Sequence, residues 1–200
     1  GAGILDKYLS KFLASKNITN FEFYSGIPGT IGGAVKMNAG CYGSETKDIL
    51  RSVRIINNDA KFYDLTNKQI NLTYRSSKIP KNNIIISAKF DYTHGNSEDI
   101  DKKMNYIKES RENTQPLQKK TSGSTFKNPK NNFAAKLIEL SGCKGMSVGD
   151  VYVSEKHANF LINTNQASAS QIEELGKKVI DQVYNQFKIR LEWEVKIIGK

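Results

Sequence analysis

The feature that most constrains this chain is the glycine-rich segment Ser25 to Glu45, SGIPGTIGGAVKMNAGCYGSE, which holds six glycines and one proline. Glycine in the middle of a helix or strand costs about 0.5–1 kcal/mol relative to alanine. The glycines follow neither the GxxxxGK[ST] nor the GxGxxG spacing, so the segment is neither a P-loop nor a Rossmann fingerprint. Small residues at this density let backbone N–H groups approach a flat or anionic ligand, and a tightly packed turn explains them equally well.

Length and composition indicate a globular protein with one large or two small domains. The chain has 200 residues, of which 38% are hydrophobic. No apolar run approaches the roughly 20 residues that span a bilayer, and no secretory signal opens the chain. Cys41 and Cys143 lack metal-ligand spacing, so we expect reduced thiols, no metal, no membrane association and a cytoplasmic location.

The net charge of +10 is compatible with a nucleic-acid partner. However, the lysine pairs are scattered, as at Lys102-Lys103 and Lys177-Lys178, and no RNA-binding aromatic motif accompanies them. Charged runs of this kind are usually solvated faces. We therefore expect no nucleic-acid partner, and an anionic small substrate remains compatible with the charge.

Hydrophobic periodicity predicts the elements of the first half. Leu5, Leu9, Phe12 and Leu13 recur at helical spacing and predict an amphipathic helix. Further on, the patterns predict a hairpin around residues 57–59, a buried strand over 83–90 and a polar helix over 98–112.

The second half begins after a connector with two prolines, and we place a domain boundary at Gln115, giving domains 1–114 and 115–200. The pattern predicts a short helix ending at Ser141-Gly142 and two strands that bracket residues 154–159. It also predicts a long helix opened by a Ser170–Glu173 capping box. Residues 189–197 alternate apolar with polar, which predicts a closing strand. The fold class is α+β.

Several side chains could carry chemistry. Arg75, in TYRSS, offers a planar charge for a carboxylate or enolate, although a lone arginine is more often a surface residue. Ser124, in SGSTFKNP, has no GxSxG elbow, but a serine donates protons without a triad. Glu194 on a polar strand face could orient or relay a proton, whereas most such glutamates are simply solvated.

Loops of the second half hold three further polar residues: Asn128, Lys144 and His157. Loops on a rigid scaffold commonly carry binding groups. On local evidence alone, His157 is better explained as a structural histidine.

Taken together, five motifs in order resemble the UDP-N-acetylenolpyruvoylglucosamine reductase family. They are GIPGTIGGAVKMNAGCYGSE, YRSS, GSTFKNP, KGMSVGDVYVSEKHANFLIN and LEWEVKIIG, and together they span nearly the whole chain. The family makes UDP-N-acetylmuramate for the cell wall. In its reaction NADPH reduces FAD, hydride passes to C3 of the enolpyruvyl group, and C2 is protonated.

The resemblance implies a role for each candidate. Arg75 would polarise the substrate carboxylate, Ser124 would donate the C2 proton, and Glu194 would orient groups or stabilise the enol-like intermediate. We expect these three side chains to meet around the substrate, UDP-N-acetylglucosamine enolpyruvate. The positions expected to hold the UDP-sugar are Asn128, Lys144 and His157. The positions expected to contact FAD are Gly26, Ile27, Thr30, Gly32, Gly33 and Asn38.

The chain departs from the family pattern at its start, because no FAD-binding lobe with a GSN loop precedes Gly1. We therefore expect only part of the FAD-binding domain in residues 1–114, and weak or no FAD binding and turnover by this chain alone. An apolar face around Ile27, Ile31 and Val35 is expected to stay uncovered and to invite self-association. Two alternatives stay open: a UDP-sugar-binding module without catalysis, and a flavin-dependent oxidoreductase of another substrate.

Overall fold

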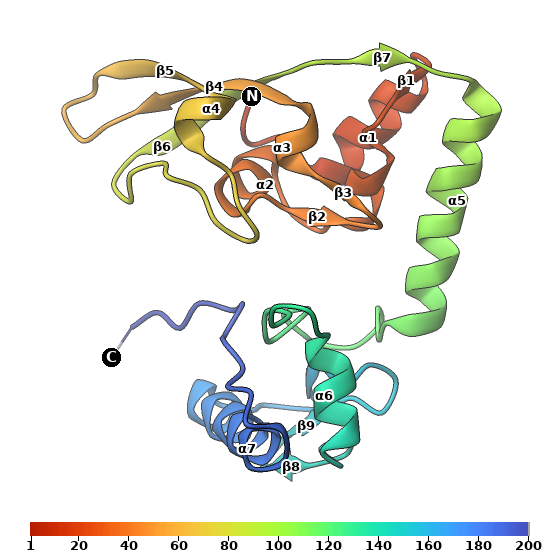
Figure 1. The fold of residues 1–200 in the computed structure, drawn as a ribbon, viewed down its shortest axis with the longest axis vertical. Helices are drawn as coiled ribbons and strands as arrows, with labels where there is room; N and C mark the ends of the chain where they lie inside the picture. Colours follow the sequence, from red (N-terminus) through yellow and green to blue (C-terminus); the bar gives the residue numbers. More distant parts are fainter. Residues whose placement is uncertain (200) are drawn as a thin grey trace. The chain divides into compact units, whose positions relative to one another are not determined.

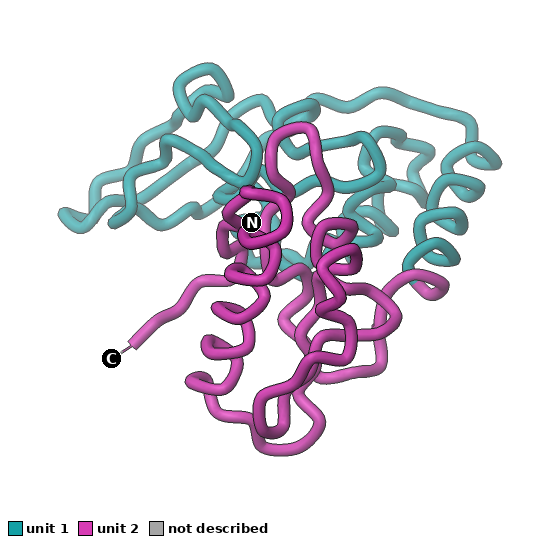
Figure 2. Tube along the Cα trace, turned by 60° about the horizontal axis from the view of Figure 1, so that its bottom comes forward, with its two compact units in different colours: residues 1–111 teal, residues 112–200 magenta. Residues whose placement is uncertain are grey.

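The computed structural model describes residues 1–199, and its chain forms two compact units, Gly1–Arg111 and Glu112–Lys200 (Figure 2). Helix α5 (Ser97–Thr114) crosses this division, which lies just before the boundary expected at Gln115. Each unit combines helices with strands around a hydrophobic core of its own. The expected α+β class is confirmed.

The first unit is built on an antiparallel sheet of order β5-β4-β6 (Figure 1). Its strands are β4 (Leu50–Ile56), β5 (Phe62–Thr66) and β6 (Ile84–Phe90), with the short pairs β1 (Ile18–Thr19) with β7 (Thr93–His94) and β2 (Gly40–Cys41) with β3 (Ser44–Glu45). Its other helices are α1 (Asp6–Ala14), the 3₁₀ turn η1 (Glu22–Gly26), α2 (Ile31–Met37), α3 (Thr46–Ile49) and α4 (Asn67–Ile70).

The predicted hairpin is confirmed as β4 and β5, and its turn shows why the sequence forms it. The side-chain Oδ1 of Asn57 accepts hydrogen bonds from the backbone N–H groups of Asp59 (3.0 Å) and Lys61 (2.9 Å). Ala60 adopts φ +57°, a left-handed conformation that is unusual for alanine. The predicted strand β6 is present but is not fully buried, because Ile84 is 66% exposed on this edge strand.

Helix α1 does not bury the whole apolar face that its sequence pattern predicts. Its buried residues are Asp6 and Ser10, while Leu5 and Phe12 are 59% and 50% exposed. Leu9 and Leu13 do pack against the core. The predicted buried face was therefore only half right, and an apolar strip of Leu5 and Phe12 with Ile4 and Tyr8 lies exposed.

The expected uncovered face around Ile27, Ile31 and Val35 is wrong. Ile31 and Val35 are 2% and 0% exposed inside the core of the first unit, and Ile27 packs against the same core. The side chains of Ile31 and Val35 face inward because α2 packs against β6. The expectation of self-association through this face loses its basis.

In the second unit, helix α7 packs against an antiparallel sheet of order β10-β9-β8, and α6 packs against α7. The strands are β8 (Ser147–Val148), β9 (Val151–Val153) and β10 (Leu161–Asn163), and the helices are α6 (Ala134–Leu140) and α7 (Ala169–Phe187). The short helix, the bracketing strands and the long helix are confirmed. The capping box of α7 is formed by Ser168 and Gln171, not by Ser170 and Glu173.

The predicted closing strand is wrong in the described residues, where the segment makes an isolated bridge between Trp193 and Phe126. Its backbone pairs briefly with residues 125–127, through bonds such as Lys127 N–H to Glu192 O at 2.8 Å. The partner segment then reaches Pro129, which has no N–H to donate. Ile189, Leu191 and Trp193 still pack on the core, whereas Ile197 is 56% exposed, so the inward face of the alternation is correct only as far as Trp193.

No helix among residues 1–199 combines the length and the apolar character that crossing a lipid bilayer requires.

Candidate functional site

Two glycines of the glycine-rich segment are explained by packing. A Cβ at Gly26 would lie 2.9 Å from the Ile107 side chain on α5, and one at Gly32 would lie 3.2 Å from Cβ of Ala2. Both distances are shorter than nearly all real Cβ contacts. For these positions, the tight-packing explanation is sufficient.

Gly33 differs, because it is exposed and a Cβ there would meet Thr30 Oγ1 at an ordinary 3.8 Å. Thr30 caps α2, and its hydroxyl accepts from the Gly33 N–H at a long 3.5 Å. Ile27 follows η1 and is half-buried against the core. The stretch around Gly33 therefore presents backbone instead of side chains to its surroundings.

Asn38 ends α2 in a left-handed conformation with φ +44° and is fully buried. Its Nδ2 donates to Glu45 Oε2 (2.9 Å) and to the carbonyl oxygen of Thr73 (3.1 Å), and its Oδ1 accepts from the Lys47 N–H (2.9 Å). The side-chain amide is thus engaged inside the first unit.

Arg75 lies at the tip of a tight turn. Thr73 and Ser76 exchange two backbone hydrogen bonds of 3.1 Å, and Arg75 between them has φ +52°. Its Nη2 donates to the carbonyl oxygen of Gly40 (3.3 Å), and its guanidinium carbon lies 5.0 Å from the centre of the Tyr74 ring. The turn therefore brings a fixed planar cation against the glycine-rich segment.

In the second unit, the structure brings the backbones of the Ser124 and Glu194 segments together. The carbonyl oxygen of Thr125, the residue after Ser124, accepts from the Glu194 N–H at 2.8 Å. Ser124 is half-buried and forms a bridge with Phe160. Arg75 belongs to the first unit, so its meeting with Ser124 and Glu194 stays a prediction.

A glycine in α7 helps to position this segment, and sequence reasoning missed it. The Trp193 ring lies directly on Gly176, where an added Cβ would overlap it. The Trp193 ring centre is also 5.0 Å from that of Phe126. A lone glycine inside a helical pattern was the available signal, because such a glycine often marks a close approach.

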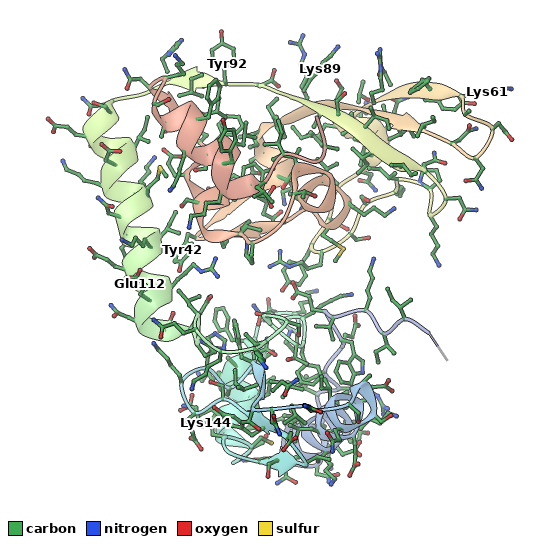
Figure 3. All side chains as sticks on the ribbon, turned by 180° about the vertical axis from the view of Figure 1, so that it is seen from behind. Tyr42, Lys61, Lys89, Tyr92, Glu112 and Lys144 are labelled. Carbon is green, nitrogen blue, oxygen red and sulfur yellow. The ribbon has the colours of Figure 1, made fainter. Side chains whose placement is uncertain are left out.

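Asn128 and Lys144 both have partners within the second unit. Asn128 Oδ1 accepts from the Ala134 N–H (2.9 Å) at the start of α6. Lys144 follows α6 in the chain and is labelled in Figure 3. Its ammonium is 2.6 Å from Glu139 Oε1. Lys144 remains a half-buried cation on a loop.

His157 is half-buried, and its ring contacts neighbouring residues of its own loop. Burial lowers the pKa of its imidazole from the usual value, with Lys144 adding to the effect. Its Nδ1 accepts from the Asn159 N–H at 3.3 Å, and its ring meets Phe160 edge-on at 4.6 Å. The lowered pKa favours the neutral ring, whose Nδ1 acts as a hydrogen-bond acceptor.

A cavity of about 650 Å³ in the second unit is lined by none of the residues predicted from the sequence. It lies between the connector 115–119 and the outer side of β9, where Tyr152 points away from the core strand positions. On its rim, Lys156 Nζ donates to the carbonyl oxygen of Glu112 (2.6 Å) at the end of α5.

Asp6 is another residue that sequence reasoning missed. It is 1% exposed, and neither carboxylate oxygen has a hydrogen-bond partner among the described residues. Burial raises the pKa of its carboxyl to about 7. An acidic residue in the first turn of a helix is ordinary, so the sequence held no signal for this burial.

Two family models match separate parts of the chain: "FAD binding domain" matches residues 1–66, and "UDP-N-acetylenolpyruvoylglucosamine reductase, C-terminal domain" matches residues 115–198. A UDP-N-acetylenolpyruvoylglucosamine reductase of Rickettsia conorii is 44% identical over the whole chain, which covers 68% of that protein. The chain belongs to the UDP-N-acetylenolpyruvoylglucosamine reductase family.

A reductase of Parvibaculum lavamentivorans is 46% identical over 199 residues, and the chain spans 64% of its length. The crystal structure of UDP-N-acetylenolpyruvylglucosamine reductase from Thermus caldophilus superposes with a TM-score of 0.87 at 34% identity, covering 97% of this chain and 70% of that one. Membership of the reductase family confirms the resemblance seen in the five motifs. The match of residues 1–66 to an FAD binding domain confirms the expectation of FAD as the cofactor.

Proposed function

We propose that this chain acts in the reduction of UDP-N-acetylglucosamine enolpyruvate to UDP-N-acetylmuramate, with FAD as cofactor and NADPH as hydride donor. The reaction belongs to peptidoglycan precursor synthesis in the cytoplasm. The observation that carries the proposal is that one chain matches an FAD binding domain and the reductase C-terminal domain in sequence order. The identity of 44–46% to named reductases over essentially the whole chain supports it.

The glycine-rich segment fits a flavin at Gly33, where the exposed backbone carries no side chain and an added Cβ would point into space that Thr30 alone borders. We assign contacts with the cofactor to Ile27, Thr30 and Gly33, with Gly26 and Gly32 allowing the tight packing behind them. FAD, when bound and reduced by NADPH, would supply the hydride that the double bond receives.

The protein's own part in the chemistry is to stabilise charge and to deliver a proton. Hydride addition at C3 leaves negative charge at C2, which delocalises into the substrate carboxylate. Arg75 would hold that carboxylate and stabilise the transition state more than the ground state. Ser124 Oγ would donate the proton to C2, and Glu194 would orient the hydroxyl and the intermediate. Asn128, Lys144 and His157 would hold the UDP-sugar.

Substrate binding is tested by calorimetry, with UDP-N-acetylglucosamine enolpyruvate titrated into the chain with and without FAD. We expect saturable binding that Lys144→Met weakens about tenfold, because a half-buried cation facing phosphates is lost. Lys136→Met is the matched control, since Lys136 is an exposed lysine on α6. Absence of binding in both conditions would contradict the proposal.

Because weak turnover at most is expected of this chain alone, catalysis is tested by following its residual NADPH oxidation with FAD and substrate at saturation. We expect Ser124→Ala to lower the rate about 10²-fold or more while leaving the substrate affinity unchanged, because it removes the proton donor. Ser122→Ala, two residues earlier and exposed, is the control. Equal rates for both variants would exclude Ser124 as the donor.

A further inference from the structure

The last residues of α2 hold both ends of the loop that carries Arg75. Asn38 Nδ2 donates to the carbonyl oxygen of Thr73 at 3.1 Å, before Arg75, and Lys36 Nζ donates to that of Ile79 at 2.5 Å, after it. In Figure 1 this loop is the yellow segment between α4 and β6, and it runs past α2. Two side chains two residues apart therefore span residues 73–79.

The Asn38 amide is fully used in this task. A side-chain amide has two N–H donors, and here one bonds Glu45 and the other Thr73, while the oxygen accepts from Lys47. The residue is 0% exposed. Asn38 therefore has no N–H left to offer a bound ligand, and its effect on chemistry passes through the loop.

A third contact joins the same two segments. Nη2 of Arg75 donates to the carbonyl oxygen of Gly40, two residues after Asn38. Gly40 is held in turn by β3, because it pairs with Glu45 in the antiparallel ladder, and a Cβ there would lie 2.9 Å from Cα of Glu45. The backbone and the guanidinium of the turn are thus fixed by neighbouring residues of one segment.

We propose that Asn38 and Lys36 are positioning residues for Arg75, which clamp its loop at both ends and hold the guanidinium in place. This inference rests on the role proposed above for Arg75, and it replaces the expectation that Asn38 contacts the cofactor. The glycine-rich segment then has two roles. Its first part, around Gly33, exposes backbone, and its later part, from Lys36 to Gly40, holds the Arg75 guanidinium in place.

Asn38→Gly tests the clamp with little disturbance of the backbone, because glycine accepts φ +44°. Asn17→Gly is the matched control: Asn17 is exposed and also left-handed, with φ +55°. The readout is amide hydrogen exchange of a peptide covering residues 72–77, which contains the two mutual bonds of Thr73 and Ser76. This measurement needs neither FAD nor substrate, so it stands whether or not the proposed function holds.

We expect Asn38→Gly to speed exchange of this peptide about tenfold or more, and Asn17→Gly to change it less than twofold. Exchange of β4 in the same sample is expected to stay unchanged, whereas a general loss of stability would speed both. Unchanged exchange of residues 72–77 in folded Asn38→Gly would overturn the clamp. Should that variant not fold, Lys36→Met carries the test at the other end of the loop, with exposed Lys68→Met as control.

Kinetics separate positioning from cofactor contact. In NADPH oxidation, a positioning role lowers kcat about tenfold or more while the Kd for FAD stays within twofold of the unsubstituted chain. A direct contact instead raises the Kd for FAD, and that result would contradict the inference. If the chain oxidises no NADPH, hydrogen exchange and the Kd for FAD decide.

Discussion

We expect Asp6 to make the stability of the first unit depend on pH in a direction opposite to that of most carboxylates. Its carboxyl is 1% exposed and unpaired among the described residues, and burial raises its pKa from 3.8 to about 7. Between these two values the folded state holds a proton that the unfolded state has lost. The free energy of unfolding therefore falls as pH rises through this range and levels off above pH 7.

The size of the effect follows from the shift. One pKa unit corresponds to about 1.36 kcal/mol, so the full shift of about 3 units is on the order of 4 kcal/mol. Between pH 5 and pH 8 the linkage relation gives a loss of roughly 2.5 kcal/mol from Asp6 alone. Asp6→Asn cannot ionise and is expected to lose this dependence, and to be the more stable form at pH 8.

The assay is urea unfolding followed by far-ultraviolet circular dichroism at pH 5 and pH 8. The control is Asp101→Asn, which removes an exposed carboxylate from α5 and is expected to keep the pH dependence of the unsubstituted chain. Because other groups titrate in the same interval, the difference between Asp6→Asn and the unsubstituted chain is the quantity of interest. An Asp6→Asn chain that loses as much stability from pH 5 to pH 8 as the unsubstituted one would refute the reasoning.

Three further substitutions test local packing and turns through the urea midpoint. Gly176→Ala is expected to destabilise by about 1–2 kcal/mol despite the better helix propensity of alanine, because its Cβ overlaps Trp193; a stabilised variant would contradict this. Ala60→Gly is expected to stabilise by about 0.5 kcal/mol, since it relieves a left-handed alanine, and a lower midpoint would count against it. Asn128→Ala is expected to cost about 1 kcal/mol, because the Ala134 N–H loses its acceptor; no change would show that the bond is not needed.

The hydrophobic pattern and the turn residues correctly predicted those elements that are stabilised by contacts between residues close together in the chain. The β4–β5 hairpin is specified by Asn57, whose side chain closes the turn, and α7 by its regular apolar face. The prediction of secondary structure failed where contacts between residues far apart in the chain determine the conformation. Residues 189–197 alternate like a strand, but the partner segment is short and ends near Pro129. The alternation correctly predicted that Leu191 and Trp193 face inward, but it could not show that the segment lacks a long partner strand.

The sequence predicted which residues belong to the candidate site. It did not predict which neighbouring residues hold them in position. Arg75 was identifiable as a cation in a motif, yet nothing near it in the sequence indicates that Asn38 and Lys36 hold its loop. Likewise, Asp6 resembles an ordinary acidic residue of a first helical turn and is buried by packing against η1. Such roles arise from contacts between segments far apart in the chain.

The indole that rests on Gly176 also has a practical consequence. Trp193 is the single tryptophan of the chain and immediately precedes Glu194. Its emission therefore reports one place in the molecule without a background from other indoles. A nucleotide-sugar that shifts the segment bearing Glu194 would change the wavelength or intensity of the Trp193 fluorescence. The protein therefore carries an intrinsic fluorescent probe next to the Glu194 carboxylate.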